Sequence, residues 1–494
     1  MMELNPGVLL NKLSEENGEK VAVVYKNEEI TYETLNKRAN KLANALIDAG
    51  LKTNDKVGVF LGNTPEFMVA YYAIQKAGGV AVPFDIRVSF EEIKNVLSFV
   101  EAKFIVTSPK FELPFFDSLT NVNIKDDDIF INEKQVSPKD LPIGVDSSED
   151  DEAVYLLTSG STGKPKLAIL TLRNLQCFPM VMEELFDIKE KFSEVYGMLL
   201  PMSHVSGPII CQELAYRGGT IVLFDRLDGD AILQSVEDNK ISFAWGVVPI
   251  YTIVMQAMDK RSYDLSSLKA LAVMGMETPL YFLQKLTKAF PNAAIIQGYG
   301  LTETTGPITG VSPRDFLQKL GSIGKAASFM DVKIVDNNGN FLKTGEYGEI
   351  VLKGPAVMKG YFKNEEISRE VIKDGWLHTK DVGYFDEDGY FYIAGRKDDM
   401  IITGGLNVFP VEIEEVLLKH PEVREVAVVG VPDEKRGAII EAVIAPKSDN
   451  ISKQEILKYC KLHLAEYKCP KRVRIMESLP KTSTGKIARS ALRT

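Results

Sequence analysis

Thr158-Ser-Gly-Ser-Thr-Gly-Lys-Pro-Lys166 is the stretch that says most about this chain, and it follows an apolar run, Ala153-Val-Tyr-Leu-Leu157. A short apolar run of this kind is typical of a buried strand. In the loop, glycines let the backbone approach an anion, exposed N–H groups and hydroxyls donate to its oxygens, and lysines add positive charge. The stretch therefore predicts a strand that leads into a phosphate-binding loop. A flexible surface loop of similar composition is the alternative.

Helical and extended patterns alternate on the amino-terminal side of this loop. Apolar residues recur at helical spacing in residues 31–46, and residues 65–76 form a second helical pattern. Residues 56–61 and 80–83 have the pattern of strands. Strands separated by helices in this way predict parallel α/β layers. From about residue 109 to residue 151 the pattern becomes acidic and irregular, and we expect no regular elements there.

The carboxyl-terminal part of the chain has a different pattern. Short strands punctuated by glycine, at residues 348–353 and 390–394, favour antiparallel β structure. A compact α+β unit follows, in which Pro410 is placed where a helix would begin. We therefore expect two domains, residues 1–397 and residues 398–494, with the boundary at Asp398.

Composition restricts the partners and the location. At 494 residues, the chain exceeds the size at which one hydrophobic core stops growing. Its formal net charge of −10 provides no general basic field, which argues against nucleic acid or an anionic membrane surface as the main partner. No apolar segment has signal-peptide length, and none approaches the ~20 apolar residues of a membrane span. We expect a cytoplasmic protein without an integral membrane segment, whose four cysteines are free and mostly buried thiols.

Three common site motifs do not fit the loop. A Walker P-loop needs four residues between its first glycine and the Gly-Lys pair, but Gly160 and Lys164 are too close and Pro165 follows. Gly298-Tyr-Gly300 has no third glycine of a dinucleotide fingerprint, and Ser161 is not in a G-x-S-x-G nucleophile motif. A Walker-type nucleotidase, a dinucleotide enzyme and a serine hydrolase are therefore poor fits.

The loop and four later segments resemble, in the same order along the chain, motifs of the adenylate-forming superfamily of acyl-CoA synthetases, luciferases and peptide-synthetase adenylation domains. The four segments are Gln297-Gly-Tyr-Gly-Leu-Thr-Glu303, Gly375-Trp-Leu-His-Thr-Lys-Asp381, Gly395-Arg-Lys-Asp398 and Pro480-Lys-Thr-Ser-Thr-Gly-Lys486. The resemblance implies an α/β fold in which a large N-terminal domain combines layered α/β subdomains with a β-barrel-like subdomain. It also implies a small, mobile α+β C-terminal domain.

Nucleotide binding is the role that the resemblance implies for the largest group of residues. They are Thr158, Ser159, Gly160, Ser161, Thr162, Gly163, Lys164, Gly275, Met276, Glu277, Gln297, Gly298, Tyr299, Gly300, Leu301, Asp381, Ile393 and Arg396. Tyr299 stands between two glycines, which would leave a ring face open for adenine to stack on; a turn-packing aromatic is the alternative. Asp381 can accept two hydrogen bonds from the ribose diol, with Arg396 assisting.

The resemblance also implies catalytic roles for Lys486, Thr302, Glu303 and His204. The Thr302 hydroxyl suits a phosphate oxygen, and the hard carboxylate of Glu303 suits Mg²⁺, with Thr158 as a further metal-site residue. A surface glutamate is the alternative for Glu303. Lys486 would contact the carboxylate substrate and the α-phosphate, where an ammonium group offsets negative charge. The alternative is that Lys486 is a solvent-exposed lysine near the end of the chain.

A hinge at Asp398 would let the C-terminal domain rotate between two steps and withdraw Lys486. Gly404 and Gly405 would then line a narrow channel for the thiol of coenzyme A. An ordinary turn at a strand end is the alternative for this segment.

Three segments resemble the walls of the family's acyl pocket, and the candidate residues in and near them are His204, Val205, Val248, Met274, Met276 and Gly298. His204 would be a gate or wall of the carboxylate pocket, with a core histidine as the alternative. Met274 and Met276 replace smaller residues and can shape an irregular apolar cavity, or they belong to the core. The segments 200–207, 245–249 and 273–277 contain no Lys or Arg, which favours an apolar acid.

The resemblance thus predicts an AMP-forming acid–thiol ligase that uses ATP, Mg²⁺ and coenzyme A, with a medium- or long-chain fatty acid as substrate and a homodimer as a compatible assembly. The alternatives are an aryl-acid–CoA ligase of the benzoate or succinylbenzoate type, a stand-alone loader of a carrier protein, and a luciferase-like monooxygenase. Leu167, Leu172 and Lys380 depart from the family pattern, which has glycine, histidine and glycine at these places.

Overall fold

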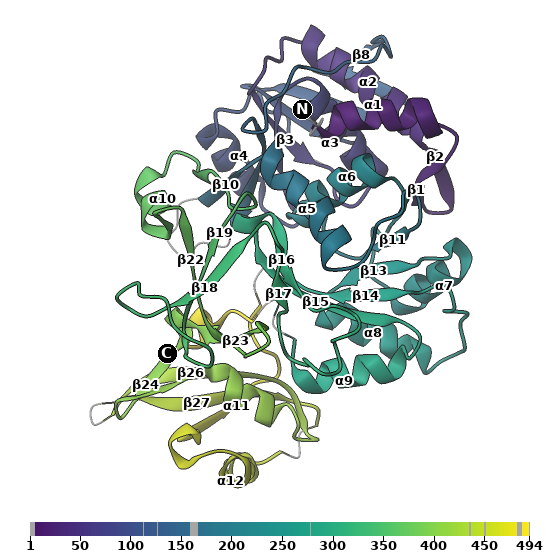
Figure 1. The fold of residues 1–494 in the computed structure, drawn as a ribbon. Coiled ribbons are helices and arrows are strands. Elements are labelled where there is room, and N and C mark those ends of the chain that lie inside the picture. Colours follow the sequence, from purple (N-terminus) through teal and green to yellow (C-terminus); the bar gives the residue numbers. More distant parts are fainter. Residues whose placement is uncertain are drawn as a thin grey trace.

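The structure is a computed structural model that describes residues 5–111, 113–125, 127–158, 166–276, 278–433, 436–448, 451–481 and 487–493. Figure 1 shows a large upper part and a smaller lower part, in which the last elements of the chain, green to yellow, lie together. This mixed α/β architecture with a large N-terminal and a small C-terminal part confirms the predicted fold class.

Two nine-stranded sheets form the large part. The first has the order β17-β16-β15-β14-β13-β11-β12-β1-β2, and its central strands from β15 to β1 are parallel. Its strands are β1 Val21–Tyr25, β2 Glu28–Thr31, β11 Val195–Met198, β12 Thr220–Leu223, β13 Phe243–Gly246, β14 Ala270–Val273, β15 Ala294–Leu301, β16 Gly306–Gly310 and β17 Lys325–Ala326.

The second nine-stranded sheet has the order β20-β10-β9-β4-β3-β5-β6-β7-β8, with parallel pairing from β9 to β6. Its strands are β3 Lys56–Phe60, β4 Val80–Pro83, β5 Phe104–Thr107, β6 Thr120–Lys125, β7 Asp128–Ile131, β8 Lys134–Val136, β9 Glu152–Thr158, β10 Lys166–Thr171 and β20 Gly360–Tyr361. The apolar run before the opening loop is the buried strand β9, as predicted.

Helices fill the space between the two sheets, because one continuous apolar core joins both inner faces to five helices. These helices are α1 Pro6–Asn17, α2 Tyr32–Asp48, α3 Pro65–Lys76, α5 Leu172–Glu184 and α6 Ser206–Arg217. The outer face of the first sheet packs on α7 Gly229–Asn239, α8 Val248–Met258 and α9 Leu280–Ala289, and the outer face of the second on α4 Phe90–Phe99. Among the described residues no helix is both long and apolar enough to cross a bilayer.

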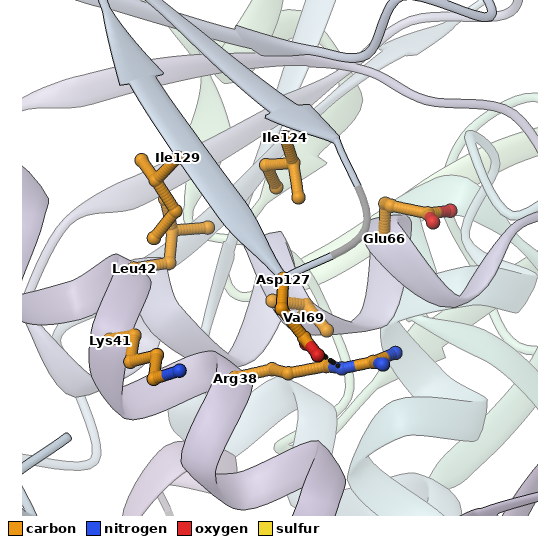
Figure 2. Close-up of a pocket in the computed structure, with 8 residues that line it drawn as sticks. All are labelled: Arg38, Lys41, Leu42, Glu66, Val69, Ile124, Asp127 and Ile129. Atoms are coloured by element: carbon orange, nitrogen blue, oxygen red, sulfur yellow. Dashed lines mark hydrogen bonds and ion pairs between the residues drawn. The ribbon is translucent and has the colours of Figure 1, made fainter. Parts of the chain in front are cut away.

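The expectation of an irregular region at residues 109–151 was wrong, because β6, β7 and β8 lie there and extend the second sheet. These strands are only three to six residues long and bury few side chains, so their pattern is weak in the sequence. Figure 2 shows how they pack: Ile124 and Ile129 are directed toward α2 and α3, and the Nε of Arg38 pairs with Asp127 Oδ1 at 2.6 Å.

Two smaller sheets complete the fold. The third is antiparallel and consists of β18 Asp331–Val335, β19 Gly348–Lys353, β21 Ile372–Lys373, β22 Trp376–Phe385 and β23 Phe391–Arg396, with α10 Glu365–Val371 beside it. The fourth consists of β24 Ile401–Thr403, β25 Leu406–Val408, β26 Val423–Asp433, β27 Gly437–Pro446 and β28 Arg472–Ile475, packed with α11 Pro410–Leu417 and α12 Lys453–His463. Four short 3-10 helices are η1 Thr302–Thr304, η2 Lys397–Asp399, η3 Glu466–Lys468 and η4 Arg489–Leu492.

The topology brings the candidate residues to one edge. In open parallel sheets, ligands bind beyond the carboxyl ends of the strands. His204 follows β11, Val248 follows β13, Met274 follows β14 and Glu303 follows β15, so all four lie beyond that edge of the first sheet. Helices α3 and α11 begin at prolines, and α8 has a proline as its second residue; the missing N–H groups of these prolines need no partner in a first helical turn.

Candidate active site

Tyr299, Asp381 and Arg396 form a connected group between the first and third sheets. The Tyr299 hydroxyl donates to Asp381 Oδ2 at 2.5 Å, and Arg396 Nη1 donates to Asp381 Oδ1 at 3.0 Å. Asp381 and Arg396 are direct cross-strand partners on β22 and β23. Burial, followed by the charge of Asp381, raises the pKa of Tyr299 well above its ordinary value, so the phenol remains a hydrogen-bond donor.

The glycines beside Tyr299 are required by the packing of strands β15 and β16, and not only by an open face of the Tyr299 ring. A Cβ added to Gly300 would lie 1.7 Å from Gly306 O, and one added to Gly298 would lie 2.6 Å from Thr309 O. The close approach of β16 to β15 therefore requires both glycines. The Tyr299 side chain that they flank is only 8% exposed, and the buried Oε1 of Gln297 on the same strand has no hydrogen-bond partner among the described residues.

Glu303 lies on η1, directly after β15, and its Oε1 accepts a 2.7 Å hydrogen bond from the Tyr361 hydroxyl. Thr158, the last residue of β9, lies near enough to Tyr361 to affect the pKa of its phenol, and its own hydroxyl donates to Lys166 O at 3.3 Å. Mg²⁺ in nucleotide sites is usually held by one or two carboxylates together with substrate phosphates. A single half-buried carboxylate whose other oxygen binds no described residue fits that requirement.

His204 faces an ion pair from the second sheet. Its Nε2 lies 3.6 Å from Asp85 Oδ2, and Asp85 accepts bonds from the Nε and Nη2 of Arg87 at 2.7 and 2.5 Å. Burial alone would raise the pKa of Asp85, but the hydrogen bonds from Arg87 and the neighbouring His204 hold it well below its ordinary value. The carboxyl edges of the two large sheets therefore meet at His204, which is 36% exposed and is not a core histidine.

The acyl-pocket candidates lie on adjacent strand ends and helix starts. Val205 directly precedes α6, and Val248 is the first residue of α8. Met274 is 7% exposed, and its Sδ and Cε lie 3.5 Å from where a Gly298 Cβ would be. Met274 therefore packs over Gly298, as a pocket wall or a core residue would. Met276 is half-buried, and the neighbouring Gly275 is exposed in a left-handed conformation, φ +89°.

The remaining predicted residues lie on or next to η1, on β23 and in the turn between β24 and β25, or outside the described residues. Leu301 and Thr302 are half-buried at the start of η1, and Ile393 is half-buried on β23. Gly404 and Gly405, with φ of +58° and +81°, form the two-residue turn of the β24–β25 hairpin, a conformation that suits glycine. Several predicted residues lie outside the described residues: Ser159, Gly160, Ser161, Thr162, Gly163, Lys164, Glu277 and Lys486.

Asp398 lies on η2, between the third and fourth sheets. Its Oδ2 is 3.7 Å from the Nζ of Lys380, which has a left-handed φ of +62°. The lysine thus occupies a backbone position that favours the glycine of the family pattern. Its backbone N–H donates to Glu349 Oε1 at 3.0 Å, which helps to hold the conformation.

Sequence reasoning missed two residues near this site. Asp85 follows β4, a parallel strand, so its place at the carboxyl edge was a usable signal. Tyr361 lies on the two-residue strand β20, which no periodic pattern could predict. Its contact with Glu303 joins residues 58 positions apart, and only the fold brings them together.

Comparison with known families identifies two matching regions. The model of the AMP-binding enzyme family matches residues 10–362, and the model of the AMP-binding enzyme C-terminal domain matches residues 412–486.

Three curated relatives match over nearly the whole chain. A feruloyl-CoA synthase of Amycolatopsis sp is 33% identical over 468 residues, which cover 94% of this chain and 93% of the relative. A 2-succinylbenzoate–CoA ligase of Bacillus licheniformis is 32% identical over 490 residues, 98% of each. A long-chain-fatty-acid–CoA ligase of Mycobacterium tuberculosis is 31% identical over 472 residues, 94% of this chain and 92% of the relative.

Solved structures of a CoA synthetase are also similar to this chain over nearly its whole length. The o-succinylbenzoate CoA synthetase of Bacillus subtilis, in complex with its acyl-adenylate intermediate, superposes with a TM-score of 0.90 at 28% identity and covers 98% of both chains. The same synthetase in complex with ATP and a magnesium ion has a TM-score of 0.88 at 28% identity, again over 98% of both chains.

Proposed function

Because the chain belongs to the AMP-binding enzyme family and is an AMP-forming acyl- or aryl-CoA ligase that uses ATP, Mg²⁺ and coenzyme A, we propose that its acid substrate is apolar and is a medium- or long-chain fatty acid. The observation that carries this proposal is that the segments at the carboxyl ends of three neighbouring parallel strands, β11, β13 and β14, are mainly apolar and contain no Lys or Arg.

These segments offer no counter-charge to a second carboxylate. Residues 200–207, 245–249 and 273–277 contain no Lys or Arg. Near His204, the guanidinium of Arg87 is already bonded to both carboxylate oxygens of Asp85. An unpaired charge in an apolar site is strongly unfavourable. A dicarboxylic acid should therefore be a poor substrate, and a monocarboxylic acid with an apolar tail a good one.

We assign the nucleotide to the group formed by Tyr299, Asp381 and Arg396. The buried carboxylate of Asp381, oriented by two donors, would bind the ribose hydroxyls, and the ring of Tyr299 would border adenine. The unpartnered Oε1 of Gln297 offers an acceptor for the adenine amino group. When bound, Mg²⁺ would offset phosphate charge beside the carboxylate of Glu303.

The second half of the site would come from the C-terminal part of the chain. We propose a domain boundary and hinge at Asp398, about which Lys486 approaches the α-phosphate for adenylation and withdraws for thioester formation. In the first step the carboxylate oxygen attacks the α-phosphorus and pyrophosphate leaves. In the second the coenzyme A sulfur attacks the acyl carbon, and AMP leaves with the bonding electron pair.

Pyrophosphate exchange with a panel of acids tests the proposal. The panel contains fatty acids of increasing chain length, ferulate, benzoate and 2-succinylbenzoate, and thioester formation is then measured with coenzyme A. We expect a medium- or long-chain fatty acid to give the highest kcat/KM and 2-succinylbenzoate the lowest. A dicarboxylic acid as the best substrate would refute the argument from the absence of Lys and Arg in these segments.

An aryl acid is the second candidate, because the feruloyl-CoA synthase match is as long as the fatty-acid ligase match. In the same panel, ferulate above every fatty acid would establish it. Transfer of the acyl group to a carrier protein but not to coenzyme A, or oxygen-dependent light emission, would indicate the remaining alternatives. We also propose a cytoplasmic location and a homodimer, for which fractionation and light scattering are the measurements.

A further inference from the structure

Glu303 is attached to one short segment, residues 355–361, at both its backbone and its side chain. The N–H of Met358 donates to Glu303 O at 2.8 Å, and the Tyr361 hydroxyl donates to Glu303 Oε1 at 2.7 Å. A third bond, from Thr305 Oγ1 to Ala356 O at 3.2 Å, attaches the residue that directly follows η1, the 3-10 helix on which Glu303 lies. The 355–361 segment therefore fixes both the position of Glu303 and the direction of its carboxylate.

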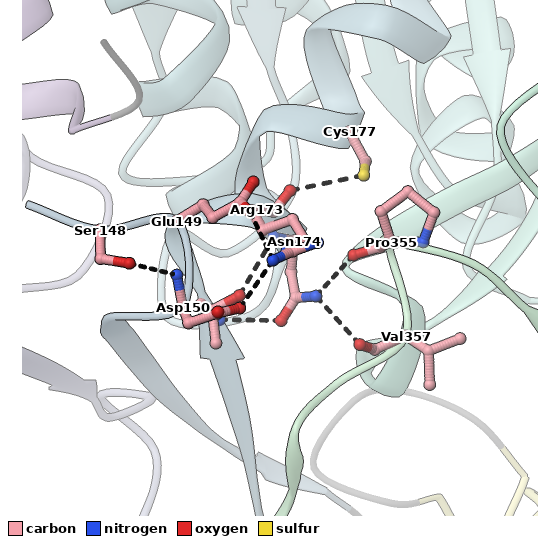
Figure 3. Close-up of polar contacts among 9 residues, drawn as sticks. Ser148, Glu149, Asp150, Arg173, Asn174, Cys177, Pro355 and Val357 are labelled. Atoms are coloured by element: carbon pink, nitrogen blue, oxygen red, sulfur yellow. Dashed lines mark hydrogen bonds and ion pairs between the residues drawn. The ribbon is translucent and has the colours of Figure 1, made fainter. Parts of the chain in front are cut away.

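The 355–361 segment is itself anchored to β10 and α5, the two elements that follow residues 159–165 in the chain. Figure 3 shows the Asn174 side chain on α5 donating to Pro355 O and Val357 O, at 2.7 and 2.9 Å. Further along, the N–H of Lys359 donates to Ile169 O, and Tyr361 pairs with Ala168 on β10. Because β10 begins at Lys166, the 355–361 segment links Glu303 to the strand that directly follows residues 159–165.

We propose that Tyr361 is a positioning residue for the magnesium site, which holds the Glu303 carboxylate through its phenol and thereby directs the other carboxylate oxygen toward the metal and the phosphates. The inference rests on the proposed function, because it takes Glu303 as the metal-site carboxylate. It adds an uncharged residue that would not bind the metal itself, and whose hydroxyl donates to Glu303, one of the two predicted metal-site residues.

The chemistry of the pair supports this role. A tyrosine hydroxyl is an uncharged hydrogen-bond donor at neutral pH, and that of Tyr361 donates directly to the carboxylate of Glu303. A hydrogen bond to one oxygen of a carboxylate fixes its rotation, and partners of this kind tune the ligands of a metal. Removing them typically weakens metal affinity by about ten- to a hundredfold.

Tyr361→Phe tests the proposal, with Tyr390→Phe as the matched control. The Tyr390 hydroxyl also donates to a carboxylate, Asp315 Oδ2 at 2.6 Å, in a part of the chain that we assign no role in the reaction. Mn²⁺ binding to the enzyme–ATP complex is measured by proton relaxation enhancement. We expect Tyr361→Phe to weaken Mn²⁺ binding about tenfold. We expect Tyr390→Phe to leave it unchanged.

A double-mutant cycle identifies the route of the effect. If Tyr361 acts through Glu303, Tyr361→Phe should weaken Mn²⁺ binding in the wild-type background but have little further effect in Glu303→Gln. Pyrophosphate exchange by Tyr361→Phe should recover at high Mg²⁺, whereas thioester formation from supplied acyl-adenylate should stay near the wild-type rate. Equal Mn²⁺ affinity in wild type and Tyr361→Phe, with both folded, would overturn the proposal; absence of exchange by wild type with every acid would instead count against the proposed function.

Discussion

Lys76 permits a direct test of how the burial of an ionisable side chain affects the stability of this fold. It is the last residue of α3 and is fully buried, with 0% of its surface exposed. Its Nζ donates to Asn11 Oδ1 on α1 and to Asn36 Oδ1 on α2, at 2.5 and 2.8 Å. These partners are neutral, so the ammonium has no counter-ion in this contact. Burial lowers the pKa of Lys76 from 10.5 to about 7.

The sign of the pH effect follows from this lowered pKa. In the unfolded chain Lys76 is charged up to about pH 10, but in the folded protein it is mostly neutral above pH 7. The unfolded state therefore binds more protons between these values, and the free energy of unfolding must rise with pH. The slope approaches about 1.4 kcal/mol per pH unit. The titration of Lys76 therefore raises the free energy of unfolding by about 2.5 kcal/mol from pH 8 to pH 10, and its contribution is nearly independent of pH below pH 6.

Urea unfolding of wild type, Lys76→Met and Lys76→Gln at pH 6, 8 and 10 measures this contribution. Only the difference between wild type and each variant is used, since other groups titrate in all three proteins. We expect wild type to gain about 2.5 kcal/mol on both variants between pH 8 and pH 10, whatever the loss from the Asn11 and Asn36 bonds. Parallel curves for the three proteins would refute the reasoning, because they would mean that Lys76 titrates alike in the folded and unfolded states.

Three further predictions concern the site. Lys486→Ala should abolish acyl-adenylate formation, with a loss of about 3 kcal/mol or more in transition-state stabilisation, yet still convert supplied acyl-adenylate to thioester; equal losses in both half-reactions would contradict a divided site. Asp381→Ala should weaken ATP binding about a hundredfold in calorimetry, since it removes both carboxylate oxygens and leaves Arg396 without its carboxylate partner; unchanged affinity would remove Asp381 from the nucleotide site. Gly300→Ala should lower the melting temperature by several degrees, because its Cβ would lie 1.7 Å from Gly306 O; an unaltered melting temperature would show that β16 can move away.

Local patterns were sufficient for many elements. The helix expected at residues 65–76 and the strand expected at residues 80–83 have those bounds in the structure, because buried helices and parallel strands carry dense apolar signals. The helix at Pro410 begins where proline was expected to place it. The strands within residues 109–151 were missed because they are short and bury few side chains, with β8 at the edge of the second sheet burying none.

The candidate site was less accessible to sequence reasoning. The motif resemblance predicted Tyr299 and Asp381 as separate nucleotide residues, but their hydrogen bond joins residues 82 positions apart. The same holds for the contact of His204 with Asp85, which arises because the carboxyl edges of the two large sheets meet. Motifs predict which residue types are present, whereas the long-range pairings that orient them depend on the tertiary fold.

Lys380 shows that a long-range contact can hold a backbone conformation that is unfavourable for the residue that adopts it. A left-handed φ of +62° costs a lysine roughly 1 kcal/mol relative to glycine. Its exposed ion pair with Asp398, at 3.7 Å, contributes less than about 1 kcal/mol and does not clearly offset that cost. The stronger constraint is the bond from its backbone N–H to the carboxylate of Glu349, which glycine could make equally well. The lysine side chain therefore contributes little to the fold at this position, and the ion pair that it forms in the structure is with Asp398, at the proposed hinge.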